Sequence, residues 1–141
     1  MRTRNYFTLL LLLTSIASLF FTGCSKKDPE PTRTELLTSA TWAFSGVTVT
    51  GTAMDGLYTT AYSNAYAGSE LSFNTNNTTS WIVLTIPLAG EWIWSADETV
   101  IQYTQSGITQ EWTVIELTST TLKISFTDST INGTTTYTFT H

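Results

Sequence analysis

Between residues 35 and 141, bulky apolar and β-branched residues alternate with polar residues in short runs that are separated by turn-forming residues. A period of two is typical of strands that bury one face, and closely spaced turns are typical of sandwiches and barrels. The runs include a first strand near 42–50 and a weaker one near 59–66, and TELLTSAT predicts one short helical turn before them. Because closure removes the two exposed edges of a meander, the pattern predicts an all-β, up-and-down antiparallel barrel of about eight strands.

The predicted turns determine which residues lie opposite one another, because a shift of one residue turns every side chain to the other face. We expect turns at 75–77, 87–90, 96–99, 106–107 and 132–133. They predict the opposite pairs Leu71–Trp81, Val83–Trp94, Thr85–Trp92, Trp94–Ile101, Trp92–Tyr103, Ile101–Trp112 and Phe126–Phe139. The phase of the pattern also predicts β-bulges at 45–46 and 115–116.

These registers place five aromatic side chains on one face of adjoining strands, namely Trp81, Trp92, Trp94, Tyr103 and Trp112. Such rings are suited to stacking against a flat or hydrophobic ligand or a sugar. An eight-stranded barrel, however, is only wide enough for its own side chains or for one small ligand. Because many other bulky residues also face inward, we expect a filled core, with a ligand pocket at one mouth as the functional alternative.

A second group of apolar residues is predicted on the outer face, namely Ile82, Leu84, Ile86, Ile93 and Val100. A contiguous apolar patch on a barrel exterior indicates that something covers it. Either the segment around Leu36–Leu37 packs on this patch, or a partner protein of the cell envelope does.

Several segments resemble the lipocalin-like domain of small lipoproteins of Gram-negative bacteria. They are TWAFSGVTVTG, LSFNTNNTTSW, GEWIWSADETVIQY, EWTVIELTSTTLKISF and TTTYTFTH, and together they span nearly all of residues 35–141. The resemblance implies a barrel and a membrane address, but no settled activity. One departure is that Ala40 stands two positions before Trp42, where true lipocalins carry glycine.

The N-terminus predicts export and a lipid anchor. Arg2 and Arg4 precede an apolar run that is shorter than the ~20 residues of a membrane-spanning helix, as in a secretory signal over residues 1–23. The following FTGC resembles a lipobox, which implies acylation of Cys24, with palmitate for example, and anchoring in the cell envelope, most simply the outer membrane. Residues 24–34 then predict a flexible tether before the barrel domain of residues 35–141. The alternative is an ordinary secretory signal beside a chance cysteine.

Charge and composition narrow the chemistry. The chain holds 11 acidic and 6 basic residues, and Lys123 is the only basic residue after Glu35, so we expect no nucleic-acid binding. Cys24 is the only cysteine and His141, at the C-terminus, the only histidine. We therefore expect no catalytic triad, no His/Cys metal site and no cofactor, and we expect that the protein is not an enzyme.

Two functions remain. The first is a membrane-anchored barrel that binds a small hydrophobic or aromatic molecule, or a glycan, at one mouth. The second is a non-enzymatic accessory subunit that uses the outer apolar patch to join an envelope assembly. In addition, Asp128–Thr130 fits a short acidic Ser/Thr pattern for bacterial O-glycosylation, which makes Ser129 a candidate site.

Overall fold

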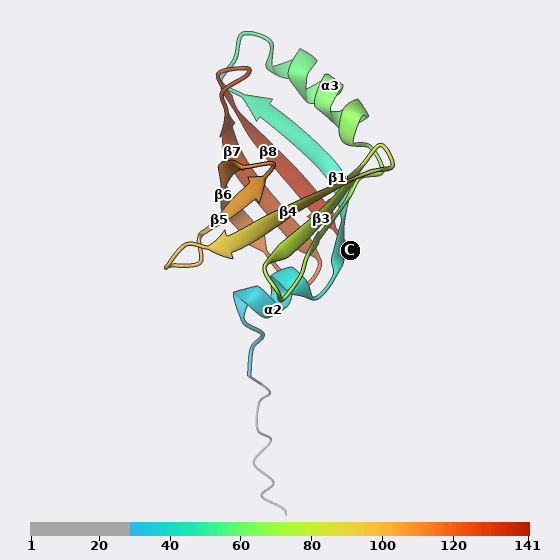
Figure 1. Cartoon of the computed structure of the whole chain (residues 1–141). Coiled ribbons are helices and arrows are strands. Elements are labelled where there is room, and N and C mark those ends of the chain that lie inside the picture. Colours follow the sequence, from blue (N-terminus) through green and yellow to red (C-terminus); the bar gives the residue numbers. More distant parts are fainter. Residues whose placement is uncertain (1–28) are drawn as a thin grey trace, which may run out of the picture. The chain divides into compact units, whose positions relative to one another are not determined.

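The computed structural model describes residues 29–141, and from Pro31 onward the chain forms a closed antiparallel barrel (Figure 1). The predicted signal peptide, Cys24 and the first part of the tether lie outside the described residues. The elements are α2 (Arg33–Thr38), β1 (Thr41–Thr50), α3 (Asp55–Tyr66), β2 (Glu70–Phe73), β3 (Thr78–Val83), β4 (Ile86–Trp94), β5 (Val100–Gln105), β6 (Ile108–Leu117), β7 (Thr121–Asp128) and β8 (Gly133–Thr140). Each strand pairs with the next and β8 pairs with β1, which confirms the predicted eight-stranded meander.

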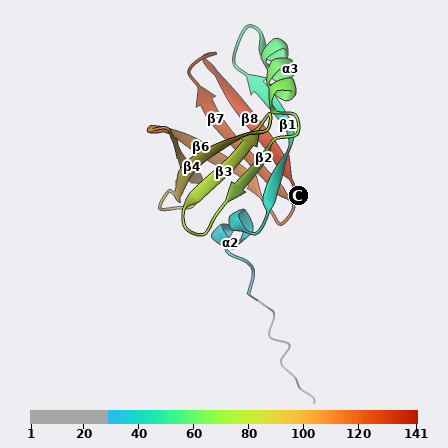
Figure 2. The ribbon, with the colours of Figure 1, turned by 45° about the vertical axis from the view of Figure 1, so that its right-hand side comes forward.

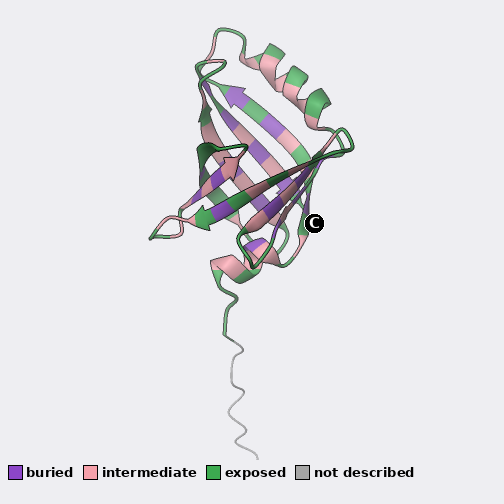
Figure 3. Ribbon diagram, in the orientation of Figure 1, coloured by how far each residue is buried: buried purple, intermediate pink, exposed green. Residues whose placement is uncertain are grey.

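The core follows the alternation of the sequence, because buried residues recur at every second position along most strands (Figure 3). Its largest fully buried side chains include Trp42, Trp112, Phe73 and Phe139. Full burial of a large apolar side chain contributes roughly 1.5–3 kcal/mol, so the buried aromatic and aliphatic residues together stabilise this barrel.

Most of the predicted registers are confirmed. The observed pairs include Leu71–Trp81, Trp94–Ile101, Trp92–Tyr103 and Ile101–Trp112. Both predicted bulges are present, between Phe44 and Gly46 in β1 and between Val114 and Glu116 in β6.

The predicted β3–β4 register is wrong. The turn lies at Leu84–Thr85, which both have positive φ (49° and 70°), so Val83 pairs with Ile86 and not with Trp94. Pro87, expected to form the turn, instead lies within β4, where it pairs with Ile82. The shift is an even number of residues, so every side chain keeps its predicted face.

The predicted β7–β8 register is wrong for a related reason. Asn132–Gly133 does not form a two-residue turn, since β7 ends at Asp128 and a longer loop leads to Gly133. Phe139 consequently lies opposite Leu122 and not Phe126. Gly133 is required by packing, because a Cβ there would lie 2.9 Å from the Thr50 carbonyl oxygen.

The strand predicted near 59–66 is also wrong, because these residues belong to helix α3. Tyr58, Tyr62 and Tyr66 recur every four residues and therefore lie on one face of this helix. Helix α3 runs along β1, whose pairing with β2 covers only Thr41–Ala43 (Figures 1 and 2). The main-chain N–H of Val49 donates to the Thr59 hydroxyl at 2.9 Å, so α3 covers an edge of β1 that no strand covers.

The predicted helical turn before β1 is confirmed as α2, which lies at the opposite end of the barrel from α3 (Figure 2). Thr32 and Glu35 form a capping box at its start, with the Thr32 N–H donating to the Glu35 carboxylate at 2.7 Å. Leu37 is fully buried, and its carbonyl accepts the indole N–H of Trp42 at 2.9 Å. Helix α2 thus closes this end of the barrel.

Candidate functional site

The barrel mouth is a cavity of about 360 Å³ at the end of the barrel that carries α3. Its walls come from α3, the tips of the β3–β4 and β5–β6 hairpins, and the β7–β8 connection. The lining residues are Tyr62, Tyr66, Trp81, Val83, Leu88, Tyr103, Gln105, Gln110, Trp112, Phe126, Asp128, Thr130 and Tyr137.

The base of the mouth consists of aromatic rings that pack on one another. Tyr66 stacks on Trp81 with 5.4 Å between ring centroids, and Tyr103 stacks on Trp112 at 4.2 Å. Trp81 meets Trp112 edge to face at 5.8 Å. These contacts leave Trp81 only 6% exposed and Trp112 fully buried, as expected of a filled core beneath a small pocket.

Polar groups surround these rings. Gln110 accepts a hydrogen bond from the Trp112 indole N–H at 3.3 Å, and Gln105 accepts one from the Tyr103 hydroxyl at 3.1 Å. The amide nitrogens of both glutamines can therefore donate to a ligand. The buried indole nitrogen Nε1 of Trp81 has no hydrogen-bond partner in the described structure. Three potential donors thus line or border the mouth.

Asp128 is the only lining residue with a charged side chain. Its carboxylate accepts the Tyr62 hydroxyl at 2.8 Å. Burial, with a further contribution from Asp128, raises the pKa of Tyr62 to about 12, and burial also raises the pKa of Tyr137. The phenols therefore stay neutral at ordinary pH. Residues 29–141 as a whole carry ten carboxylate side chains against two basic ones, a formal charge of −8 that disfavours anionic ligands.

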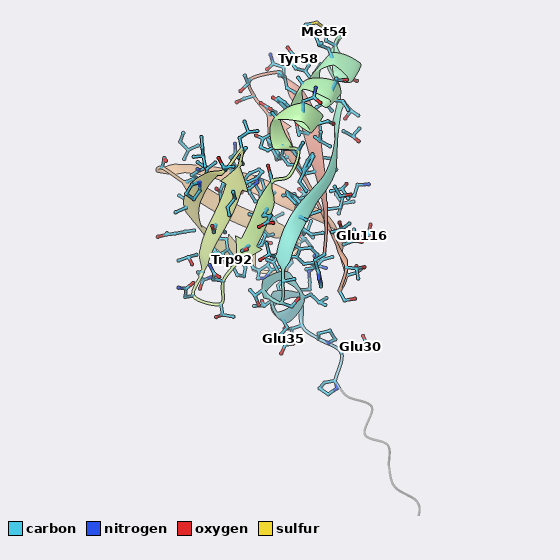
Figure 4. All side chains as sticks on the ribbon, turned by 90° about the vertical axis from the view of Figure 1, so that its right-hand side faces the viewer. Glu30, Glu35, Met54, Tyr58, Trp92 and Glu116 are labelled. Carbon is cyan, nitrogen blue, oxygen red and sulfur yellow. The ribbon has the colours of Figure 1, made fainter. Side chains whose placement is uncertain are left out.

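The structure brings together three of the five predicted ligand-binding aromatics, Trp81, Tyr103 and Trp112. Trp92 and Trp94 belong to the other end of the barrel, toward α2, as Figure 4 shows for Trp92. The indole N–H of Trp92 donates to the Asn74 carbonyl, and that of Trp94 donates to the Thr34 hydroxyl. Both side chains therefore stabilise the end that α2 closes.

The five predicted patch residues do not form one patch. Ile82, Leu84 and Ile86 cluster at the tip of the β3–β4 hairpin, and Leu84 and Ile86 are 61% and 59% exposed. Ile93 lies farther along β4, opposite Gln102, because the observed β3–β4 register separates it from Leu84. Val100 pairs with Thr113 at the start of β5.

The cover predicted for this patch is not formed either, because Leu37 is fully buried and packs in the barrel core.

Ser129 is exposed in the β7–β8 connection, beside the mouth residues Asp128 and Thr130. The Asp128 carboxylate accepts the main-chain N–H of Thr130 at 2.9 Å, which holds the connection in a tight turn. The exposed side chain of Ser129 is accessible for modification, and its glycosylation remains a prediction.

Sequence reasoning missed the α3 tyrosines and the polar residues of the mouth, Gln105, Gln110 and Asp128. The four-residue spacing of the tyrosines was a usable signal, because it favours a helix over a strand. The polar residues stand at hairpin ends, where no periodicity marks them.

Within residues 29–141, no group of three or more His, Cys, Asp or Glu side chains could hold a metal ion. No helix in the same range is long and apolar enough to cross a membrane.

Fold and site together define a class: small closed antiparallel barrels of lipocalin-like architecture with a pocket at one end. No protein-family model matches the chain, and no curated protein matches it in sequence. Among solved structures, the chain is similar to a DUF4847 family protein from Bacteroides vulgatus ATCC 8482, with a TM-score of 0.52 and 11% identity. The match covers 76% of this chain and 95% of that one, and at this identity it shows the fold alone.

Proposed function

We propose that the protein binds a small uncharged molecule, hydrophobic, aromatic or a sugar unit, at the barrel mouth. The observation that carries this proposal is the unpartnered Nε1 of Trp81, a buried donor on a residue that lines the mouth. An unsatisfied buried donor costs about 1–3 kcal/mol, and a ligand oxygen placed against it would remove that cost.

Size and charge support the same class of ligand. A cavity of about 360 Å³ falls at the small end of the ligand pockets of proteins, which span roughly 300–1,000 Å³. The mixture of aromatic walls with a few convergent polar groups is typical of such pockets. The carboxylate of Asp128 and the net negative charge of the domain argue against fatty acids, phosphates and other anions.

The test is a titration with neutral aromatic compounds, fatty alcohols and mono- and disaccharides, followed by intrinsic tryptophan fluorescence and calorimetry. Trp81→Phe removes the free donor but keeps a ring, so we expect about tenfold weaker binding if the indole N–H contacts the ligand. Trp94→Phe is the matched control, because Trp94 lies at the closed end. Equal loss in both variants, or no binding across the panel, would contradict the proposal.

We further propose that Cys24 is acylated and holds the protein in the cell envelope, most simply at the outer membrane. The support is the sequence of residues 1–24, together with a domain that begins only at Pro31 and so leaves a short spacer. Metabolic labelling with a palmitate analogue should mark the wild-type chain and not Cys24→Ala. An unlabelled wild-type chain that fractionates with soluble proteins would refute this anchor.

The exposed tip of the β3–β4 hairpin supports a second candidate, an accessory subunit of an envelope assembly. Leu84 and Ile86 lie at the tip, where they stabilise nothing in the barrel core. If a partner covers them, Leu84→Ser with Ile86→Ser should abolish its cross-linking in cells and leave the barrel's melting temperature unchanged. Unaltered cross-linking would exclude this surface.

A further inference from the structure

The wall of the barrel is split between β6 and β7 on the side of the mouth. Pairing of these strands runs from Leu117–Leu122 to Thr113–Ser125 and stops there. Two facing segments therefore do not pair with each other, Ile108–Trp112 of β6 and Phe126–Asp128 of β7. Both remain strands, because the β6 segment pairs with β5 and the β7 segment pairs with β8. We call this gap the β6–β7 slit.

Main-chain hydrogen-bonding groups line the slit. The N–H of Val114 donates to the Thr99 carbonyl at 2.9 Å, so the main-chain N–H and C=O groups of Val114 point toward β5. Because the direction alternates along a strand, Thr109 and Glu111 point the other way, into the slit. The same alternation from the Thr113–Ser125 pair makes Thr127 point into the slit from β7.

The slit is a real hollow that continues into the mouth. A cavity of about 550 Å³ follows it and is lined by Thr109, Glu111, Thr113, Ser125 and Thr127 among others. This cavity shares four residues with the mouth: Gln110, Phe126, Asp128 and Thr130. A chain that lay in the slit could therefore place a side chain in the mouth.

Of the barrel's other two breaks in pairing, one is covered and the other carries a proline. Helix α3 covers the free part of β1, where Thr59 satisfies the N–H of Val49. In β4, the segment before Glu91 has no partner in β5, and Pro87 stands there with no N–H to offer. Native proteins protect strand edges in these ways, and within the described residues the slit has no such protection.

We propose that the slit accepts an extended, basic polypeptide segment, which pairs as an added strand with the free edge of β6. Main-chain bonds to Thr109 and Glu111 supply affinity, and every second side chain of the segment points into the mouth. The charged lining residues of the slit, Glu111 and Asp128, are both acidic, which favours lysine or arginine in the partner. This inference goes beyond the proposed function and stands even if the mouth binds no small molecule.

The probe is the peptide acetyl-Lys-Val-Lys-Tyr-Lys-Val-amide, titrated by calorimetry into the full chain in detergent micelles. Proline at position 109 removes an N–H that points into the slit, so it blocks strand addition without removing a bond to β5. Thr109→Ala is the matched control, because both variants lose the hydroxyl that contacts Thr104 at 2.8 Å. We expect binding at least about tenfold weaker for Thr109→Pro and within about twofold of wild type for Thr109→Ala.

A second measurement keeps the test decisive if Thr109→Pro folds poorly. Bound peptide should slow amide hydrogen exchange at Thr109 and Glu111 of the wild-type chain. In addition, Glu111→Gln removes a charge from the slit and should weaken peptide binding, whereas Glu70→Gln removes a charge from β2 and should not. The inference is overturned if the wild type does not bind the peptide, if Thr109→Pro binds it normally, or if these amides gain no protection. Binding of maltotetraose in the slit in place of the peptide would overturn it as well.

Discussion

Replacement of Tyr66 by alanine should separate the anchoring of α3 from the stability of the barrel. Helix α3 has no buried residue, and Tyr62 and Tyr66 are the side chains of α3 that pack against the hydrophobic core. The Tyr66 ring lies 5.4 Å from that of Trp81 and 5.0 Å from that of Tyr137. Truncation of this side chain therefore removes two close aromatic contacts from the wall of the mouth.

The size of the effect follows from burial. Truncation of a fully buried phenylalanine or tryptophan costs about 3–5 kcal/mol, and Tyr66 is only partly buried, so about half, roughly 2 kcal/mol, is expected. In a domain of this size that loss lowers the melting temperature by roughly 8 °C. Tyr66→Phe keeps the ring and loses only the hydrogen bond between the Tyr66 and Tyr137 hydroxyls, so it should cost less, about 1 kcal/mol.

Tyr58→Ala is the matched control, because Tyr58 has one tyrosine neighbour, Tyr62, at 6.4 Å. Urea unfolding gives the free energies, and amide exchange of α3 reports its local opening. Exchange in α3 should accelerate in Tyr66→Ala while β8 stays protected up to the global limit. If Tyr58→Ala and Tyr66→Ala are equally destabilised, or α3 exchanges no faster, the assigned anchoring role is refuted.

Three further predictions concern the barrel and its tyrosines. Gly90→Ala should destabilise the fold by about 1–3 kcal/mol in urea unfolding, because a Cβ would lie 2.8 Å from the Thr104 carbonyl oxygen; unchanged stability would contradict this packing. Trp42→Phe should cost about 1–2 kcal/mol through loss of its bond to the Leu37 carbonyl, and a melting temperature equal to that of wild type would argue against it. Because burial and Asp128 raise the folded-state pKa of Tyr62 to about 12, its contribution to stability is complete below pH ~10 and is lost as the pH rises toward 12. Ultraviolet titration of Tyr62→Phe should therefore lack one phenol that ionises near pH 12, and loss of a phenol that ionises near pH 10 would contradict the shift.

The architecture could be predicted because a strand register that is wrong by an even number of residues still assigns each side chain to the correct face. Both misplaced hairpins, β3–β4 and β7–β8, moved by an even number of residues, so each inward residue remained inward. The turns themselves were misjudged because Pro87 and Gly133 were both taken as turn residues. Pro87 instead lies at a free strand edge, and Gly133 allows close packing against β1. Proline and glycine are common in turns as well as at strand edges and close contacts, and only the position of the neighbouring strands shows which role a given residue has.

The candidate site was only half predictable for the same kind of reason. Trp81 and Trp112 follow from alternation, whereas the division of the five aromatics between two ends depends on how far each strand extends. The β3–β4 shift also dispersed the predicted apolar patch, since it carried Ile93 away from Leu84. Contacts such as that of Tyr62 with Asp128 join residues far apart in sequence, and no local pattern reports them.

The two ends of this barrel differ in a way that bears on both proposals. At the α2 end, the indole N–H groups of Trp42 and Trp94 are satisfied by Leu37 and Thr34 of α2. At the α3 end lie the unpartnered Trp81 indole and the unpaired edges of β6 and β7. The chain that precedes the barrel joins it at α2. If Cys24 is acylated as proposed, the anchor is therefore joined to the barrel through α2, the helix at the end opposite the mouth. Relocation of the anchor to the C-terminus should then preserve peptide binding to detergent-solubilised protein, because neither site uses the tether.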